Sequence, residues 1–208
     1  VRHLAAVETL GSANVIASDK TGTLTRNEMT VRVIATAGGR VTFSGTGYAP
    51  EGELSRDGGG GIEGSLGSEM VRALSAADRA SNAVLHEREG HWTVQGDPTE
   101  GALIVAARKA GLEGETLDAR FARLAEVPFS SERKLMSTVH SDAEREERLL
   151  AFTKGAPDVL LARCSHELVG DQARPLSDRR RADILDANEG LAGEALRYNA
   201  EKRIDKER

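Results

Sequence analysis

The sequence predicts an α+β fold for residues 30–197. Segments with strand and helix patterns alternate irregularly along this region, and signals for antiparallel hairpins gather in its middle. The residues before position 30 offer a single strand, so they cannot build a complete parallel α/β sheet by themselves. A mixed domain that follows a short N-terminal piece is therefore expected.

The N-terminal piece is expected to begin with the end of a helix at residues 1–12. The apolar run Val15–Ser18 then predicts a buried strand. Two further strands are expected around a hairpin turn at Gly38-Gly39, namely Val31–Ile34 and Val41–Phe43. Residues 55–68 are rich in glycine and are expected to form a flexible loop.

Two helices are predicted in the next part of the chain. Residues 69–85 have helical spacing, with Met70, Leu74 and Ala77 on one face. A short strand is expected at His91–Val94. The second helix follows it: Asp97 is a plausible N-cap, Pro98 suits the first helical position, and Gly111 is expected to end the helix.

The remaining elements are strands followed by helices. A helix is expected to open at Pro157 and to run to about Cys164, and another is expected at residues 179–187. The charged segment 141–148 predicts a solvated turn between strands. The expected strands before these helices are residues 124–129, 135–139 and 148–153.

Composition limits the class of protein. The chain has 208 residues with 39% hydrophobic and 3% aromatic residues, and no stretch approaches the roughly 18–20 apolar residues that span a bilayer. No signal peptide is visible, and one cysteine, Cys164, fits a packing residue in a reducing compartment. The net charge of −5 argues against a nucleic-acid partner. A soluble, cytoplasmic domain without a membrane span is expected.

Residues 19–25, DKTGTLT, carry the main chemical signal. A carboxylate after a buried strand can attack phosphorus and form an acyl phosphate, and Thr21, Gly22 and Thr23 offer room and donors for a phosphoryl group. This string resembles the phosphorylation motif of the P-type cation-transporting ATPases. The resemblance implies that Asp19, Lys20 and Thr21 form the catalytic loop and that the Asp19 carboxylate and the Thr21 carbonyl bind Mg²⁺.

Four further motifs resemble the ATP-binding domain of the same family, most closely its calcium-pump branch and bacterial members. They are GDPTEGAL at 96–103, PFSSERK at 128–134, KGAP at 154–157 and LAGEALR at 191–197. The resemblance implies an antiparallel sheet with flanking helices at 30–197, after an incomplete haloacid-dehalogenase-like α/β phosphorylation domain at 1–29. It covers nearly the whole chain as far as Arg197.

The resemblance also assigns the nucleotide contacts. It places Phe129 against the adenine ring, Glu100 near the adenine amino group, Lys154 deep in the pocket beside Gly155, and two basic residues around the ligand, Lys134 and Arg197. Met136 lines the adenine pocket or belongs to the core. From the residues alone, Phe129 also fits a core position, and Glu100 also fits a first-turn residue that favours the helix dipole.

Several family motifs do not occur in the sequence. The second half of the phosphorylation domain, with its TGD and GDGxND motifs, the TGE motif and the transmembrane helices are missing. After Arg197 the family continues with an apolar strand, whereas residues 198–208 are mostly charged and are expected to be a disordered tail or sequence foreign to the family.

These observations predict an ATP-binding, cytosolic part of a cation pump. ATP and Mg²⁺ are the expected cofactors, ATP or ADP and the rest of the pump are the expected partners, and the parent protein is expected in the cell membrane with this region on the cytoplasmic side. The isolated chain is expected to bind nucleotide without sustained turnover. The alternatives are a non-catalytic nucleotide-binding module and a stand-alone phosphatase. Thr21 disfavours the phosphatase because such enzymes carry a general acid/base Asp at that position.

Overall fold

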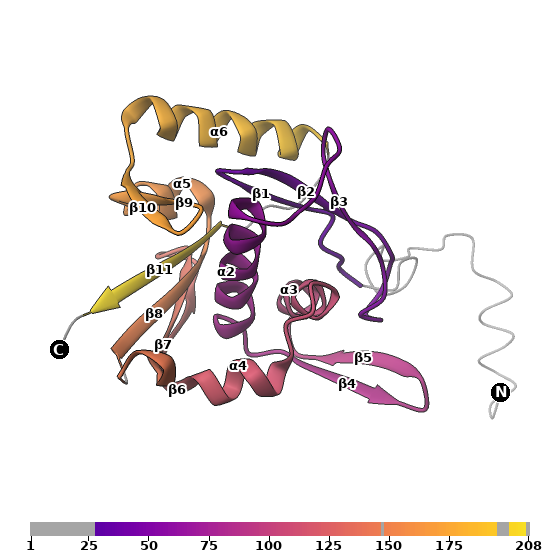
Figure 1. The fold of residues 1–208 in the computed structure, drawn as a ribbon. Coiled ribbons are helices and arrows are strands. Elements are labelled where there is room, and N and C mark those ends of the chain that lie inside the picture. The colour runs from indigo at the N-terminus through magenta and orange to yellow at the C-terminus, as the bar shows by residue number, and fades with distance from the viewer. Residues whose placement is uncertain (1–27, 147, 195–199, 207–208) are drawn as a thin grey trace, which may run out of the picture.

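The computed structural model describes residues 28–146, 148–194 and 200–206, with side chains as far as Glu194. Its helices and antiparallel strands confirm the α+β prediction (Figure 1). The N-terminal piece, including the predicted strand Val15–Ser18, lies outside the described residues. In the described part, strands form four antiparallel sheets around the central helix α2.

The first sheet has the order β1-β2-β3. The predicted hairpin is confirmed, with its turn at Ala37-Gly38 and Thr36 opposite Gly39. The expected loop at 55–68 was partly wrong, because its first residues form a strand that pairs with β2. The three strands are β1 (Val33–Thr36), β2 (Gly39–Phe43) and β3 (Leu54–Arg56).

Helix α2 (Ser65–Arg79) lies between two hydrophobic clusters. Its first turns pack Met70 and Leu74 with Phe43 of β2, whereas Ala76 and Ala80 at its other end pack with Phe152. The predicted helix at 69–85 is confirmed in position, but it begins earlier and ends at Arg79. The chain leaves it to form a strand at Val84.

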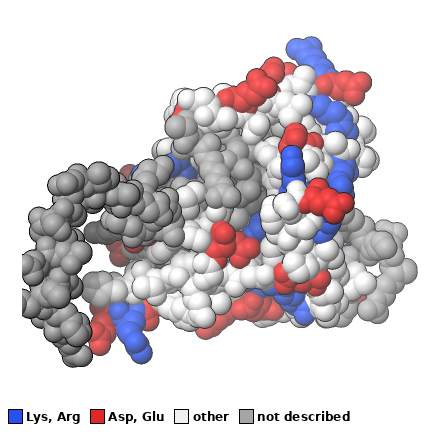
Figure 2. Space-filling view, turned by 180° about the vertical axis from the view of Figure 1, so that it is seen from behind, with Lys and Arg blue, Asp and Glu red and all other residues white. Residues whose placement is uncertain are grey.

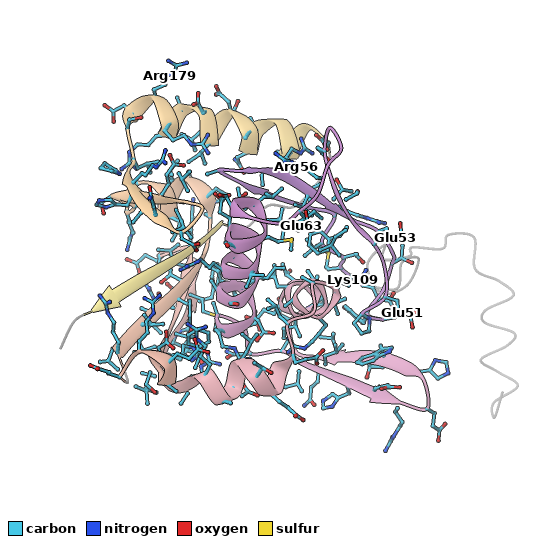
Figure 3. The ribbon with its side chains drawn as sticks, viewed as in Figure 1. Glu51, Glu53, Arg56, Glu63, Lys109 and Arg179 are labelled. Carbon is cyan, nitrogen blue, oxygen red and sulfur yellow. The ribbon has the colours of Figure 1, made fainter. Side chains whose placement is uncertain are left out.

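A hairpin of β4 (Val84–Arg88) and β5 (His91–Gln95) follows, and the strand expected at 91–94 is confirmed. Helix α3 (Pro98–Lys109) packs against it so closely that a Cβ on Gly101 would lie 2.5 Å from Val94 Cγ1. At the far end of α3, Lys109 Nζ donates to the Ser44 carbonyl at 2.8 Å and fixes the β2–β3 loop, which carries Glu51 and Glu53 (Figure 3).

The largest sheet has the order β11-β8-β7-β6, with all pairs antiparallel. The three strands predicted for its middle are confirmed and are longer than expected. The expected turn at 141–148 shrinks to a 3₁₀ turn at Ala143–Arg145, because β7 continues to Asp142 and β8 begins at Arg148. The strands are β6 (Phe121–Ser130), β7 (Leu135–Asp142), β8 (Arg148–Gly155) and β11 (Ala200–Lys206), and α4 (Gly114–Arg120) precedes β6.

Strand β11 corrects the expectation of a disordered tail. Its backbone pairs with β8 from Ala200 opposite Gly155 to Lys206 opposite Leu149. A free strand edge offers N–H and C=O groups that any backbone can pair with, and charged residues are common on edge strands. The polar composition of this segment therefore does not prevent a strand.

The last helices cover the β9–β10 end of the molecule (Figure 1). Both were predicted, although α5 (Pro157–Leu161) is shorter and α6 (Asp178–Gly193) longer than expected. Between them lies a hairpin that was not predicted, β9 (His166–Val169) and β10 (Gln172–Pro175). The buried Glu69 of α2 ties this hairpin to the first sheet, since it accepts from Gly38 N at 2.7 Å and Gly170 N at 2.5 Å.

Acidic and basic side chains are interspersed on the face shown in Figure 2. No continuous stripe of one sign is visible on the described part of that face. Ion pairs on the described part of the chain include Arg72 with Asp171 at 2.7 Å and Arg180 with Glu167 at 2.8 Å.

Candidate nucleotide site

Lys154 and Glu100 form an ion pair at the end of β8. The Lys154 Nζ lies 2.9 Å from Glu100 Oε1, and both side chains are largely buried. Lys154 Nζ also donates to Ser81 Oγ at 3.0 Å. Two residues from separate parts of the chain, Glu100 of α3 and Ser81 after α2, thus hold the ammonium group that β8 carries.

Glu100 reaches this point because Asp97 fixes the start of α3. Asp97 Oδ1 accepts from Thr99 N at 2.7 Å and from Glu100 N at 3.2 Å, which confirms the predicted N-cap. Glu100 Oε2 then accepts from Asn82 N at 2.7 Å and Ala83 N at 3.0 Å. Glu100 is thus a first-turn residue and also the counterion of Lys154.

Glycine at position 96 lets this turn approach the end of α2. Gly96 has φ +119°, and a Cβ there would lie 3.0 Å from Ala83 Cα. The GDPTE segment therefore packs against the three residues Ser81, Asn82 and Ala83, which we call the α2–β4 junction. The requirement for glycine at the start of that segment is steric.

Lys134 and Gly155 are also brought together. Lys134 ends the β6–β7 turn with a left-handed backbone (φ 54°), and its carbonyl accepts from Ala156 N at 3.1 Å. Gly155 has φ +157°, and a Cβ on it would overlap the Lys134 carbonyl oxygen. The side chain of Lys134 is exposed, so the turn presents a cation close to the end of β8.

Phe129 and Met136 lie on neighbouring strands with opposite degrees of burial. Phe129 is 61% exposed, which excludes the core position that was one interpretation of it. Met136 is buried and stands opposite Lys154 in the β7–β8 register. A β-bulge between Val127 and Ser130 interrupts the β6–β7 pairing at Phe129.

The α2–β4 junction was missed by sequence reasoning. Asn82 Nδ2 donates to Glu126 Oε1 at 2.9 Å, and Glu126 pairs with Arg123 at 3.0 Å, so the junction is also tied to β6. Arg123 Nη1 donates to the Ser81 carbonyl at 3.3 Å. Ser81 and Asn82 carry no signal of a site in the sequence, because they lie inside the segment 69–85 that was predicted as a helix.

Strand β7 carries a buried histidine, His140. His140 is fully buried and shares hydrogen bonds with the Phe121 carbonyl at 3.1 Å and Thr138 Oγ1 at 3.0 Å. Burial lowers the pKa of the His140 imidazole, and the charges of Arg79 and Arg123 act in the same direction. The hydrogen bond to Phe121 opposes these effects without cancelling them.

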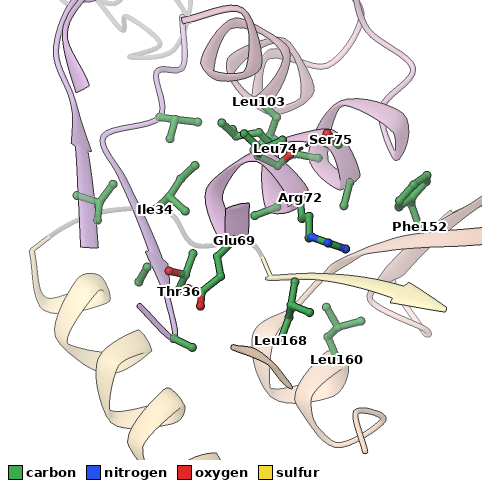
Figure 4. A pocket seen from close by; sticks show the side chains of 18 of the residues that line it. Ile34, Thr36, Glu69, Arg72, Leu74, Ser75, Leu103, Phe152, Leu160 and Leu168 are labelled. Atoms are coloured by element: carbon green, nitrogen blue, oxygen red, sulfur yellow. Dashed lines mark hydrogen bonds between the residues drawn. The ribbon is translucent and has the colours of Figure 1, made fainter. Parts of the chain in front are cut away.

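A long groove among the described residues lies elsewhere, between β1, α2 and α5. Its volume is about 2130 Å³, and it is lined by Ile34, Leu74, Leu103 and Leu160, among others (Figure 4). Glu69 and Arg72 face it but are paired within the protein. Neither Lys154 nor Phe129 lines it, so the polar site does not coincide with this groove.

The remaining predicted site residues are not placed. Asp19, Lys20, Thr21 and Arg197 lie outside the described residues. Within the described ranges, no group of three or more His, Cys, Asp or Glu side chains is arranged to hold a metal ion. A search of the same ranges finds no helix with the length and apolar character needed to cross a membrane.

Comparison with known proteins supports a family assignment. A family model described as "P-type ATPase, cytoplasmic domain N" matches residues 68–206. "Probable cation-transporting ATPase F" of Mycobacterium tuberculosis (strain ATCC 25618 / H37Rv) is 41% identical over 201 residues, which are 96% of this chain and 22% of that protein. The "Calcium-transporting ATPase" of Bacillus subtilis (strain 168) is 38% identical over 197 residues, 95% of this chain and 22% of that protein.

A human relative is similar to the same extent. "Calcium-transporting ATPase type 2C member 1" of Homo sapiens is 38% identical over 198 residues, 94% of this chain and 21% of that protein. The chain thus spans about a fifth of the length of these relatives. The family match also includes β11, although its charged sequence had suggested a segment foreign to the family. The chain belongs to the family of P-type ATPase cytoplasmic N domains.

Proposed function

We propose that this chain binds ATP or ADP at the end of β8, as the nucleotide-binding part of a cation-transporting P-type ATPase. The observation that carries the proposal is the Lys154–Glu100 ion pair, which is buried beside the closely packed backbone of Gly155. A buried ion pair costs desolvation energy and is a weak source of stability. A binding role gives this costly arrangement a function.

The exposed ring of Phe129 is the proposed surface for adenine. Stacking of a base on an aromatic side chain contributes about 1–3 kcal/mol, and a ring that is 61% exposed has an accessible face. Met136 is proposed to line the floor beneath the base. Glu100 would accept from the adenine amino group near Lys154.

The cations are proposed to serve the ligand's negative charge. Lys154 lies deep in the site, Lys134 stands exposed on the β6–β7 turn, and Arg197 follows α6 in the sequence. Because phosphoryl transfer depends mainly on positioning and electrostatics, these groups would hold the nucleotide while its γ-phosphate reaches Asp19. A carboxylate oxygen of Asp19 would attack the γ-phosphorus, the bond to the bridging oxygen would break, and ADP would leave.

Asp19 and Thr21 are the proposed protein ligands of Mg²⁺, through a carboxylate and a carbonyl oxygen. Bound there, the ion would neutralise charge on the phosphoryl group. Lys20 is proposed to belong to the same catalytic loop. The aspartyl phosphate would then drive transport by the parent protein, whose membrane part and remaining cytoplasmic domains are the proposed partners.

The relatives' names point to a cation, and two of them name calcium. We therefore propose a cation, with calcium first, as the transported ion, and the cytoplasmic side of a membrane as the place of this domain. The isolated chain is proposed to bind nucleotide without sustained turnover. Lasting ATPase activity that disappears in Asp19→Asn would contradict this last point.

Isothermal titration of the 208-residue chain with ATP tests the proposal. We expect saturable binding at micromolar to millimolar concentrations, a loss of at least about fivefold in Phe129→Ala, a larger loss in Lys154→Ala and none in Asp19→Asn. Val127→Ala is the matched control, since it truncates a 47% exposed side chain on the same strand, next to the bulge. A folded chain that does not bind ATP would refute the proposal.

A further inference from the structure

We propose that Ser81 is a positioning residue: its hydroxyl holds the Lys154 ammonium in place and so sets the affinity of the site for nucleotide. The inference rests on the proposed function. Ser81 belongs to none of the sequence motifs that suggested this site, and it comes 73 residues before Lys154 in the chain. The two side chains meet only because the end of α2 packs against the end of β8.

The hydrogen bonds of Ser81 make its hydroxyl oxygen an acceptor toward Lys154. Its Oγ donates to the Ala77 carbonyl at 2.8 Å, one turn back along α2. The hydroxyl proton is thus engaged, and the oxygen faces Lys154 Nζ as an acceptor at 3.0 Å. Ser81 is buried, so a fixed protein oxygen takes the place that water would otherwise fill.

The ammonium group of Lys154 is held at two of its three N–H bonds. Among the described residues, Glu100 Oε1 accepts one at 2.9 Å and Ser81 Oγ accepts another at 3.0 Å. Two acceptors on different elements fix both the position and the rotation of the group. A lysine already held in place loses less conformational entropy when a ligand binds it.

The backbone of Ser81 is itself held from two sides. Arg123 of β6 donates to the Ser81 carbonyl at 3.3 Å, and the next two backbone N–H groups donate to Glu100. A hydroxyl on such a braced segment keeps its place when Lys154 moves. Ser75, also on α2, provides a contrast, because its Oγ makes the same bond to a carbonyl four residues back (Val71, 2.8 Å) without a lysine partner.

The test compares Ser81→Ala with Ser75→Ala in the 208-residue chain, with two readouts. The first is ATP affinity by isothermal titration, where we expect Ser81→Ala to weaken binding about threefold to tenfold and Ser75→Ala to leave it within about twofold. The second, measured without nucleotide, is the NMR order parameter of the Lys154 ε-methylene in ¹³C-lysine-labelled protein. We expect it to fall in Ser81→Ala and to stay unchanged in Ser75→Ala.

Each outcome decides a different point. An unchanged order parameter would overturn the positioning role, and a lower order parameter with unchanged ATP affinity would show that the held lysine does not serve the nucleotide. If the unmodified, folded chain bound no ATP, the proposed function would fail first and this inference with it. Should Ser81→Ala not fold, Ser81→Cys keeps the size of the side chain with a much weaker acceptor, and the same two results are expected.

Discussion

Glu100 lies three residues after the Asp97 cap, and this spacing lets one carboxylate act both at the start of a helix and in the candidate site. In the first turn of α3 it opposes the positive end of the helix dipole, and from there it reaches both Lys154 and the α2–β4 junction. Sequence reasoning had offered a helix role and a site role for Glu100, and the two do not exclude each other. In the structure a carboxylate in the first turn of α3 reaches the lysine at the end of β8.

His140 gives a prediction about pH. In the unfolded chain an imidazole takes up a proton near pH 6.5, whereas burial lowers the pKa of His140 in the folded chain. Below about pH 6.5 the unfolded state therefore binds more protons. The contribution of His140 to the free energy of unfolding is complete above that pH and is lost as the pH falls toward the folded pKa.

Urea denaturation between pH 7.5 and 5.5 measures this effect. We expect His140→Gln to reduce the loss of stability over this range, while His86→Gln, at an exposed position of the β4–β5 hairpin, is the control. Equal pH dependence in His140→Gln and the unmodified chain would show that the buried imidazole does not contribute.

At the scale of elements, the sequence predicted the helix ends and turns that depend on the residues at those positions. The Asp97-Pro98 start and the Gly111 end of α3 were predictable because capping and turn conformations belong to those residues themselves. Strands β3, β9 and β10 were missed because three or four residues carry no clear alternation. Strand β11 was missed because its pairing depends on the free edge of β8 rather than on its own side chains.

Motifs supplied the candidate residues of the site, whereas the contacts between them come from the fold. Lys154, Gly155, Glu100 and Phe129 were proposed from motifs, but the meeting of Lys154 with Glu100 depends on the packing of β8 against the start of α3. Ser81 could not be found from the sequence, because it lies within a segment predicted as a helix and belongs to no motif. Only the fold shows that its hydroxyl faces a lysine.

The β4–β5 hairpin offers a test at the scale of one element. Its two-residue turn has positive φ at both Glu89 (53°) and Gly90 (77°), which is the type I′ pattern that favours Asn-Gly. A backbone with positive φ is more strained at Glu than at Asn. We therefore expect Glu89→Asn to raise the free energy of unfolding by about 0.5–1 kcal/mol. Chemical denaturation measures the change. Glu87→Asn, within strand β4, should give no gain, and a loss in Glu89→Asn would refute the turn assignment.

At the scale of the whole molecule, α2 connects the two hydrophobic clusters. Leu74 belongs to the cluster with Phe43, and Ala76 and Ala80 belong to the cluster with Phe152. If α2 loses its contacts with one of these clusters, its contacts with the other cluster are weakened as well. The described sheets should therefore unfold together rather than in separate steps.

Leu74→Ala tests this coupling. Leu74 is 1% exposed, so the truncation should lower the free energy of unfolding by about 2–5 kcal/mol, whereas Val71→Ala on the same helix, at 38% exposure, should change it much less. We expect circular dichroism and the fluorescence of Trp92 to report one coincident urea transition in both variants. Two separate transitions would mean that the clusters fold independently.

Strand β6 has a consequence for self-association. Among the described strands it pairs only with β7, yet it carries the exposed apolar side chains Leu124, Val127 and Phe129. The unpaired backbone groups of such an edge can ordinarily pair with a strand of a second chain, which extends the sheet and can begin a fibril. Two register breaks distort the strand, and Pro128 removes one N–H donor beside the aromatic ring. The chain can thus display a ring to solvent while its backbone makes a poor template for another copy.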